Sequence, residues 1–312
     1  MNDQSTNTVL MVRPFFFRMN EQTSVNNYYQ SAVSLIKSEE VRGKASDEFD
    51  RFVTLLTANG VNVLTQNDLG QHDTPDSIFP NNWISTDQKG RVIIYPMFAA
   101  NRRLEKQIPL IPMLKEVCQS GLEVVDLSYF EDEYKFLEGT GSLVLDHENE
   151  IAYMSISERS NQEVLSQWAL ISGYRTISFE SFQTVNNHRL PIYHTNVMMS
   201  IGSKWAVVCA EAIDNISDRL MVLDQLSIGR QVITISEEQT SRFAGNILEL
   251  KNKGGETLIV MSKSAFKAYT NTQLDELRSH GRLVLSDIET IEKYGGGSAR
   301  CMLAEVFLTL KS

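Results

Sequence analysis

Three residue types that together support nucleophilic catalysis stand far apart in this sequence. Cys301 follows a glycine-rich run at residues 295–300, His194 stands two residues before Asn196, and Glu138 lies in a Leu-Glu-Gly-Thr-Gly run. A thiol whose proton passes to an imidazole can attack an electrophilic carbon and form a covalent intermediate. The sequence therefore predicts covalent, cysteine-dependent catalysis, provided that the fold brings these residues and a carboxylate together.

Cys301 differs from the other two cysteines in its surroundings. A free cysteine is usually a small buried apolar residue, and Cys118 and Cys209, in a predicted helix and strand, fit that description. The glycines before Cys301 allow close backbone approach, and Arg300 places beside the thiol a cation that favours the thiolate. His194 could be structural, and Glu138 could bind the backbone amides of a turn. A catalytic role is favoured only because both residues are expected to converge with Cys301.

The composition excludes several classes of protein. The chain has 312 residues, of which 42% are hydrophobic, and a net charge of −10, which argues against a nucleic-acid partner. No apolar run has the roughly 18 residues of a membrane helix, and the polar N-terminus lacks the features of a signal peptide. Three cysteines without metal-site spacing predict neither a disulfide framework nor a zinc site. We therefore expect a cytoplasmic protein.

One unit recurs five times along the chain: an amphipathic helical stretch, a glycine that we expect to end the helix in the left-handed conformation, and a short β-rich run. Five such units at similar spacing indicate a repeat architecture. The helical stretches are residues 46–59, 106–120, 160–172, 217–228 and 272–280, the glycines are Gly60, Gly121, Gly173, Gly229 and Gly281, and the strands are 61–64, 122–125, 174–177, 230–233 and 282–285.

A β-hairpin with a polar turn lies between successive units. The first strands of four hairpins are predicted at 82–85, 141–145, 196–199 and 246–250, with return strands at 91–95, 151–154, 205–208 and 258–261. The fifth hairpin is divided between the ends of the chain, because residues 301–308 lack a following partner and residues 9–12 lack a preceding one. Pairing these two segments would close the ring and remove two exposed sheet edges.

The repeats predict an α/β fold: a single domain over residues 1–312, built as a five-bladed propeller that the terminal strands close. Equivalent hairpin ends converge near the axis of such a ring. Glu138, His194 and Cys301 all fall at that end, and Asn81 and Asn82 open the first hairpin. The predicted ring thus brings the thiol, imidazole and carboxylate together.

At these residues the sequence resembles the amidinotransferase and arginine deiminase superfamily, whose five-bladed fold is called the pentein fold. An N-terminal run, Val12-Arg13-Pro14, with Asn26-Asn27 and Gln30, resembles the citrulline-hydrolase branch in particular. The motifs that carry the superfamily resemblance are Phe79-Pro80-Asn81-Asn82, Leu137-Glu138-Gly139-Thr140-Gly141, Ser157-Glu158-Arg159-Ser160-Asn161, Tyr193-His194-Thr195-Asn196 and Gly295-Gly296-Gly297-Ser298-Ala299-Arg300-Cys301.

The resemblance implies a role for each matching residue. Cys301 would be the nucleophile, His194 the general acid and base, and Glu138 a carboxylate that orients substrate nitrogens. Arg159 matches a position that holds the substrate carboxylate in deiminases. Arg103, in the Arg102-Arg103 pair, is a second candidate for that contact, although the pair could equally be the exposed start of a helix. Asn81, Asn82 and Asn196 complete the predicted substrate-binding set.

The sequence departs from arginine deiminases at Asn82, Gly141 and Asn196, where those enzymes carry aspartates. Aspartate suits a guanidinium cation, because charge-assisted bidentate hydrogen bonds are its natural partners. A neutral asparagine offers both donors and an acceptor, which suits a ureido group. The substitutions favour citrulline over arginine or methylarginine, although Glu138 could still balance one cation.

The predicted enzyme is a hydrolase of carbon–nitrogen bonds other than peptide bonds. It converts citrulline to ornithine, carbon dioxide and ammonia through a covalent Cys301 intermediate, and the resemblance implies no metal or other cofactor. The partner is a small arginine- or citrulline-like amino acid, and the sequence leaves the oligomeric state open, a homo-oligomer included. The alternatives are an arginine deiminase, a dimethylargininase, an amidinotransferase and a non-catalytic pentein that serves as a binding module.

Overall fold

The computed structural model describes residues 3–30, 38–119 and 121–311. Within them the chain forms five three-stranded mixed sheets, each an antiparallel pair whose second strand pairs in parallel with a third. The sheets are β17-β1-β2 (Ala304–Glu305, Thr8–Arg13, Asn62–Asn67), β3-β4-β5 (Ile84–Thr86, Arg91–Ile94, Glu123–Asp126), β6-β7-β8 (Leu143–Asp146, Ile151–Ser155, Arg175–Phe179), β11-β12-β13 (Met199–Ile201, Trp205–Val208, Gln231–Thr234) and β14-β15-β16 (Leu248–Lys251, Thr257–Ser262, Arg282–Ser286).

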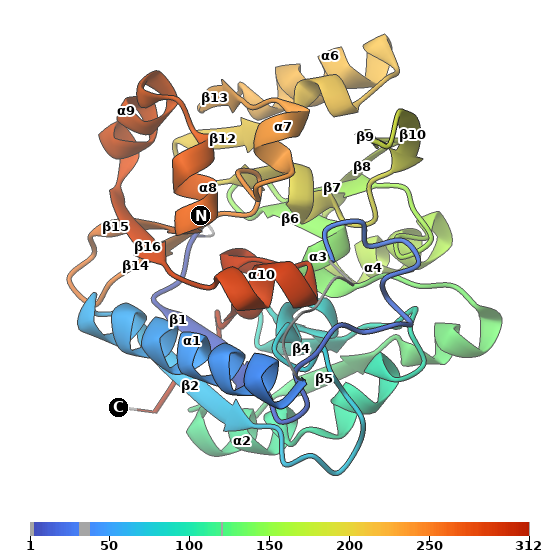
Figure 1. Ribbon diagram of the computed structural model, residues 1–312, viewed down its shortest axis with the longest axis vertical. Helices are drawn as coiled ribbons and strands as arrows, with labels where there is room; N and C mark the ends of the chain where they lie inside the picture. Colours follow the sequence, from blue (N-terminus) through green and yellow to red (C-terminus); the bar gives the residue numbers. More distant parts are fainter. Residues whose placement is uncertain (1–2, 31–37, 120, 312) are drawn as a thin grey trace.

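A helix connects the second and third strands of every one of these sheets (Figure 1). This confirms the predicted order of hairpin, helix and strand, with shifted helix ends; Ser120, the predicted last residue of the second helix, lies outside the described residues. The five helices are α1 (Ser38–Ala58), α2 (Leu110–Val117), α4 (Gln162–Ser172), α6 (Ile216–Leu226) and α9 (Asn271–His280). The other helices and strands are α3 (Gly139–Ser142), α5 (Thr195–Met198), α7 (Glu237–Thr240), α8 (Lys263–Ala268), α10 (Glu289–Gly295), and the hairpin β9-β10 (Phe182–Val185, His188–Pro191).

Helix α4 shows why these segments fold as they do. The side chain of Asn161 accepts hydrogen bonds from the first free backbone amides, those of Glu163 and Val164. The apolar face packs inward through Val164 and Trp168, and Gly173 ends the helix with a φ of +85°. Asn215 caps α6 in the same way, and Thr270 begins a capping box at α9.

Two of the five predicted glycines do not adopt the left-handed conformation, although Gly281 does cap its helix. Gly60, Gly173 and Gly229 adopt positive φ as predicted, but Gly121 and Gly281 do not. Gly281 is extended, with a φ of −178°, and a Cβ there would lie 3.0 Å from the backbone oxygen of Thr257. Close approach to the neighbouring strand, rather than left-handed backbone, explains that glycine.

The predicted starts of four strands lie in short helical turns instead. Asn82 ends the 3₁₀ turn η1 (Pro80–Asn82), Gly141 lies in α3, Asn196 in α5, and Cys301 in the 3₁₀ turn η5 (Ala299–Met302). The regular strands begin two or three residues later, at Ile84, Leu143, Met199 and Ala304. The site motifs thus occupy equivalent turns, each immediately before the first strand of its sheet.

The two ends of the chain pair as predicted. Strand β1 is antiparallel to β17, with Val9 opposite Glu305 and Leu10 opposite Ala304. Near the same ends, α1 and α10 lie side by side (Figure 1). The Glu48 carboxylate on α1 accepts hydrogen bonds from the backbone amides of Thr290 and Ile291 on α10. The first and last parts of the sequence therefore support each other.

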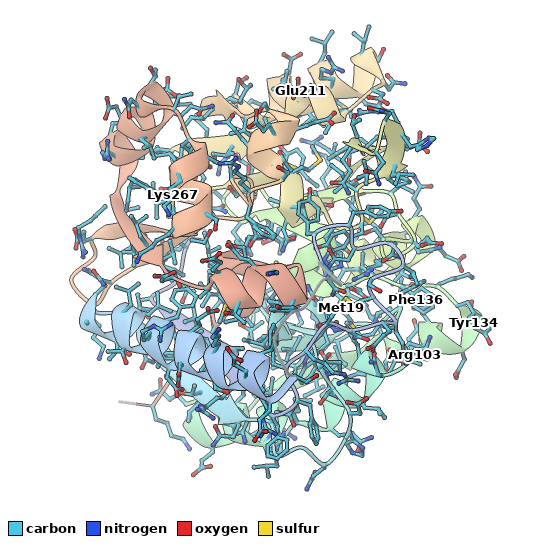
Figure 2. All side chains as sticks on the ribbon, viewed as in Figure 1. Met19, Arg103, Tyr134, Phe136, Glu211 and Lys267 are labelled. Atoms are coloured by element: carbon cyan, nitrogen blue, oxygen red, sulfur yellow. The ribbon has the colours of Figure 1, made fainter. Side chains whose placement is uncertain are left out.

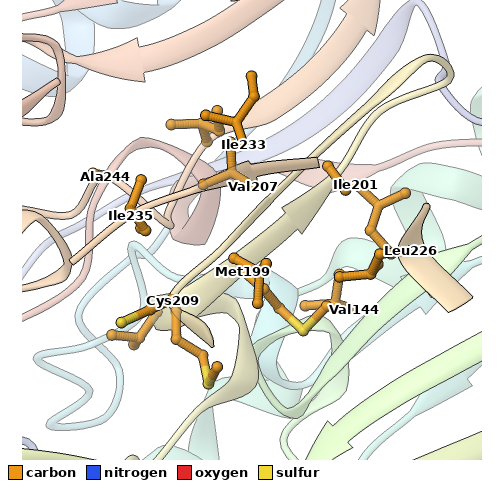
Figure 3. Packing of buried hydrophobic residues seen from close by; sticks show 14 of the residues in the cluster. Val144, Met199, Ile201, Val207, Cys209, Leu226, Ile233, Ile235 and Ala244 are labelled. Carbon is orange, nitrogen blue, oxygen red and sulfur yellow. The ribbon is translucent and has the colours of Figure 1, made fainter. Parts of the chain in front are cut away.

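The apolar core lies between the sheets and their helices. The largest cluster, shown in part in Figure 3, joins β6 through Val144, β11 through Met199 and β13 through Ile233. Cys209 belongs to this cluster and Cys118 to another, which confirms the prediction that both are core residues. Among the helices that the structure describes, none is long and apolar enough to cross a membrane.

Candidate active site

The glycine-rich segment holds Cys301 by close packing. Its backbone amide donates a hydrogen bond to the carbonyl oxygen of Ser298 at 3.0 Å, and the residue is 5% exposed. Gly296 has a φ of +65°, and a Cβ there would lie 2.6 Å from the side chain of Asn27. A Cβ at Gly297 would lie 2.9 Å from Phe79. The glycines allow the close backbone approach that their sequence predicted.

Two asparagine amides surround the sulfur of Cys301. The Nδ2 of Asn246 lies 3.1 Å from Sγ, and the Nδ2 of Asn196 lies 3.6 Å from it. The Oδ1 of Asn196 is 3.9 Å from the same sulfur, so this amide can also accept from the thiol. The chain thus presents neutral hydrogen-bonding groups to the sulfur.

His194 and Glu138 form a direct pair on neighbouring turns. The Nε2 of His194 lies 2.8 Å from Oε2 of Glu138, and the backbone amide of Phe98 donates to Oε1 of Glu138 at 3.0 Å. Both residues are buried. Each carboxylate oxygen already has a protein donor, so Glu138 is placed to orient the imidazole, and the predicted contact with substrate nitrogens has no direct support here.

Opposing effects set the charge states of this pair. Burial raises the pKa of Glu138, but Arg159 and the hydrogen bond to His194 outweigh burial and bring it to about 2. Burial lowers the pKa of His194 to about 4, although Glu138 acts in the opposite direction. An ionised Glu138 beside a neutral imidazole requires that Nε2 carries the proton, which leaves Nδ1 free to accept one.

Burial also dominates at the thiol. It raises the pKa of Cys301, against the lowering effects of the Ser298 backbone contact, Asn246 and Arg300. Arg300 lines a separate polar cavity with Glu249 and Glu305. The predicted cation is therefore present and lowers the pKa of the thiol as expected, but its effect is smaller than that of the loss of water around the sulfur.

The candidate active site is a pocket in front of Cys301. It is narrow, with a cavity of about 10 Å³, roughly the room for one water molecule. Asn27, from the N-terminal segment at residues 14–30, covers it, donating to the carbonyl oxygens of Gly295 and Gly296. The lining residues are Asn27, Asp76, Phe79, Asn82, Arg102, Arg159, Tyr193, His194, Gly295, Gly296, Gly297 and Cys301.

Arg159 reaches the pocket as predicted, and it is already engaged. Its guanidinium donates to the backbone oxygen of Thr23 at 2.8 Å and to Oδ1 of Asn26, and it lies 4.8 Å from the centre of the Tyr193 ring. The Nη1 atom is 3.5 Å from Glu138. Arg159 thus ties the N-terminal segment to the His194–Glu138 pair.

The structure does not bring Arg103 into the pocket. Its guanidinium donates to the backbone oxygens of Met97 and Phe98 and lies 5.4 Å from the centre of the Phe136 ring, beside which Figure 2 shows it. Its neighbour Arg102 lines the pocket instead, buried and bonded to Oδ1 of Asn82 at 2.7 Å. The first turn of a 3₁₀ helix, η2 (Arg102–Gln107), directs the two adjacent arginines to different sides.

The two predicted asparagines of the first hairpin differ in position. Asn82 lines the pocket, whereas Asn81 lies behind it and bonds Oγ1 of Thr140 at 3.3 Å. The Oδ1 of Asn81 accepts from Nδ2 of Asn82 at 3.1 Å. Gly141 fits closely here, because a Cβ would lie 2.5 Å from Asn82 and 2.8 Å from the His194 ring.

Sequence reasoning missed Asp76, which lines the pocket and is 2% exposed. One carboxylate oxygen accepts from Asn20 and Thr23, while Oδ1 has no hydrogen-bond partner among the described residues. The side chain lies 3.9 Å from Arg102. Burial raises the pKa of Asp76, against the lowering effects of Arg102 and of these two hydrogen bonds. A carboxylate with a free buried oxygen is suited to bind a cationic group, whose charge favours the ionised form.

Asn246 and Arg102 were also left out of the predicted site. Asn246 has a signal in the sequence, because it opens the fourth hairpin in the same register as Asn82, Asn196 and Cys301. Arg102 was recognised only as part of a pair. Among the residues described, no group of three or more histidine, cysteine, aspartate or glutamate side chains could hold a metal ion.

A family model matches most of the chain. The family model described as N,N dimethylarginine dimethylhydrolase, eukaryotic, matches residues 13–308. A comparison with curated proteins finds no match. Because the family match spans most of the chain, it carries more weight than any individual structural likeness.

Three solved structures illustrate the fold. Apo ArgZ, an arginine dihydrolase from the ornithine–ammonia cycle in cyanobacteria, is 15% identical with a TM-score of 0.71, covering 96% of this chain and 40% of that one. An AgrE variant bound to L-arginine is 16% identical with a TM-score of 0.72, covering 98% and 41%. A DDAH variant from Pseudomonas aeruginosa, bound to citrulline, is 14% identical with a TM-score of 0.66, covering 97% and 100%. The chain spans about two fifths of these ArgZ and AgrE chains, and all three likenesses show a shared fold.

Proposed function

The chain belongs to the pentein superfamily and within it to the N,N-dimethylarginine dimethylhydrolase family, whose members hydrolyse carbon–nitrogen bonds other than peptide bonds, and on that premise we propose that it hydrolyses the guanidino group of an arginine derivative. N,N-dimethylarginine is the first substrate to test. The family match supports this dimethylargininase alternative better than the citrulline prediction.

One observation carries the proposal: a cysteine and a carboxylate-oriented histidine line the same narrow pocket. Cys301 and His194 both face this pocket, and Glu138 holds the imidazole from behind. A binding module has no need for a nucleophile, a base and an orienting acid in one place, whereas this combination is typical of enzymes that form covalent intermediates.

The proposed reaction begins from a neutral thiol and a neutral imidazole. Nδ1 of His194 accepts the thiol proton as the Cys301 sulfur attacks the guanidino carbon. The imidazole then protonates the departing dimethylamine, and the carbon remains bonded to sulfur. Water, deprotonated by the same imidazole, attacks that carbon and releases the thiol with citrulline. Dimethylarginine and one water thus give citrulline and dimethylamine.

The amino-acid end of the substrate would bind at the opposite charges in the pocket. We propose that Asp76 receives the α-ammonium group and that Arg102 and Arg159 receive the carboxylate. Because Arg159 now holds Asn26 and Thr23, the carboxylate would replace the Asn26 side chain. The narrow cavity means that the segment at residues 14–30 must move for the substrate to enter.

We also propose that the five sheets form one closed pentein ring, so that residues 1–312 act as a single catalytic domain. The pairing of β1 with β17 supports this, because it completes the fifth sheet from both ends of the chain. The side chain of Thr86 supports it as well, since Oγ1 donates to the backbone oxygen of Glu305 and accepts from the amide of Phe307, joining neighbouring sheets.

The test offers the purified protein N,N-dimethylarginine, arginine and citrulline, with products identified by mass spectrometry. Dimethylamine and citrulline from the first compound are the expected result, and Cys301→Ala should lose at least about a thousandfold in turnover. Cys118→Ala is the matched control, since Cys118 lies in the core away from the pocket. Full turnover by Cys301→Ala, or no turnover of any of the three compounds, contradicts the proposal.

Citrulline hydrolysis is the second candidate, favoured by the neutral amides at the reacting end. Asn196 and Asn246 contact the sulfur and Asn82 lines the pocket, and Asp76 is the one acidic side chain among the described residues that line it. A neutral ureido group fits such surroundings without an unpaired charge. Ornithine, carbon dioxide and ammonia from citrulline, with no reaction of dimethylarginine, would support this candidate instead.

A further inference from the structure

The amide of Asn246 is held in one orientation beside the nucleophile. The residue is 1% exposed and precedes β14, and its backbone amide donates to the carbonyl oxygen of Phe243 at 2.9 Å. Its Nδ2 donates to the backbone oxygen of Asn196 at 3.0 Å. Because a carbonyl oxygen can only accept, this contact identifies the nitrogen side of the amide, which is the side that lies 3.1 Å from Sγ of Cys301.

The oxygen end of the same amide makes no hydrogen bond that would stabilise its position. Oδ1 of Asn246 is buried and has no hydrogen-bond partner among the described residues. A buried oxygen without a donor costs free energy, and folded proteins usually avoid it. The orientation of this amide therefore leaves Oδ1 without a hydrogen bond while it directs Nδ2 at the sulfur. Packing alone does not explain this orientation.

Asn196 provides an internal comparison. Both ends of its amide approach the sulfur, with Nδ2 at 3.6 Å and Oδ1 at 3.9 Å. Asn196 can therefore accept from the protonated thiol or donate to the thiolate, whereas Asn246 can only donate. Asn246 thus favours the charged form of the sulfur, and its contact is the shorter of the two amide donors.

We propose that Asn246 is a further catalytic residue, which stabilises the anionic sulfur of Cys301 through a hydrogen bond from Nδ2. This inference rests on the proposed covalent function. Cys301 is 5% exposed, so water contributes little to stabilising its charge. The neighbouring cation, Arg300, lines a separate cavity with the carboxylates of Glu249 and Glu305. Of the two side-chain amides at the sulfur, the amide of Asn246 supplies the nearer donor.

The test measures how alkylation of Cys301 by iodoacetamide depends on pH in Asn246→Ala, Asn246→Asp and Asn246→Ser. Peptide mass spectrometry separates Cys301 from Cys118 and Cys209. The rate at neutral pH is divided by the plateau rate at alkaline pH, which cancels changes in access. Loss of a hydrogen bond to a charged group should lower this ratio at least about tenfold in Asn246→Ala. Asn246→Asp should lower it further, and Asn246→Ser, which keeps a donor, should lower it less.

Turnover gives the second readout. Asn246 does not line the pocket, so its loss should lower kcat and leave KM nearly unchanged. Ser200→Ala is the matched control, because Ser200 is buried on β11 and its hydroxyl has no partner among the described residues. Circular dichroism and thermal unfolding establish which variants are folded, and Asn246→Ser decides the question if the other two fail to fold.

An alkylation ratio equal to wild type in every folded Asn246 variant overturns the inference, as does an equal drop in Ser200→Ala. The proposed function fails separately, if the wild-type protein turns over none of the guanidino or ureido compounds. The alkylation result does not depend on turnover, so the two failures are distinguishable.

Discussion

Burial acts on Cys301 and His194 in the same direction, toward the neutral forms. It raises the pKa of the thiol and lowers the pKa of the imidazole to about 4. The resting pair is therefore a thiol beside an imidazole, rather than a thiolate beside an imidazolium. An incoming guanidinium would add a positive charge to a site with little water, where its effect on the sulfur is strongest.

The first prediction concerns the pH dependence of turnover. In the free enzyme, kcat/KM should stay level through the neutral range and fall at higher pH as Cys301 loses its proton, because the proposed reaction starts from the neutral thiol and burial keeps that pKa above its ordinary value. His194 stays neutral until the pH falls toward about 4, so it should add no inflection near 6.5. A pH–rate profile of wild type checks both statements. An acid limb centred near 6.5 that disappears in His194→Gln would contradict them.

The second prediction concerns Asp76. Asp76→Asn keeps the shape of the side chain and removes its charge, so an α-ammonium group would lose a charge-assisted hydrogen bond. KM should rise about ten- to a hundredfold, with a smaller change in kcat. Repeating the assay with a substrate analogue that lacks the α-amino group provides the control, since wild type and variant should then differ little. Equal KM values for the full substrate would remove Asp76 from the binding site.

At the residue scale, the sequence predicted those side chains whose chemistry and spacing coincide. Cys301 and His194 line the pocket with Asn82, as their motifs indicated. Asp76 lies in a loop without a periodic pattern. Its Oδ1, which has no partner in the described part of the chain, can be recognised only once the structure places Asn20 and Thr23 around Oδ2. Burial of the thiol likewise depends on segments distant in sequence, so the flanking Arg300 indicated one lowering effect on the pKa but not the larger raising effect of burial.

At the element scale, periodicity predicted the helices and strands but not the turns between them. Five helices and their following strands appear where the repeats placed them. The residues that carry the site motifs adopt helical turns such as α3 and α5, which are too short to produce a periodic signal. The glycine of the second repeat, Gly121, does not adopt positive φ, so composition alone does not distinguish a cap from a loop glycine.

The third prediction uses the close packing in α3. Gly141→Ala would place a methyl group 2.8 Å from the His194 ring and 2.5 Å from Asn82. The imidazole must shift, and a displacement of about 1 Å at a reacting group costs on the order of a hundredfold in rate. We expect that loss in kcat from a folded protein, measured by turnover and thermal unfolding.

Gly43→Ala is the matched control for this glycine substitution. Gly43 is exposed in α1, and its Cβ would meet nothing within 4 Å. Alanine in a helix interior should therefore stabilise the protein by about 1 kcal/mol and leave turnover unchanged. A kcat equal to that of wild type in Gly141→Ala would contradict the prediction, because the added methyl group would then be accommodated without displacing His194.

At the scale of the whole molecule, the repeats predicted that the chain's two ends meet. The unpaired runs at residues 9–12 and 301–308 indicated a divided hairpin, and Val9 and Leu10 do pair with Glu305 and Ala304. The pairing covers only two residues of the longer predicted run, because η5 occupies Ala299–Met302. The nucleophile therefore stands in the turn that precedes the joining strand, so its position depends on both ends of the chain.

The fourth prediction tests that dependence. Leu10 is 1% exposed, belongs to a cluster with Ala304 and Val306, and pairs with Ala304, which stands just after the turn that carries Cys301. Leu10→Ala should destabilise the protein by about 2–5 kcal/mol, whereas Leu170→Ala, at a site 81% exposed, should change stability by no more than about 0.5 kcal/mol.

Urea unfolding followed by tryptophan fluorescence and by turnover should give coincident transitions in wild type and in Leu10→Ala. Turnover that persists at urea concentrations above the fluorescence transition would mean that the active site keeps its structure without the paired ends. Turnover lost well below that transition would mean that the ends separate before the rest of the protein unfolds.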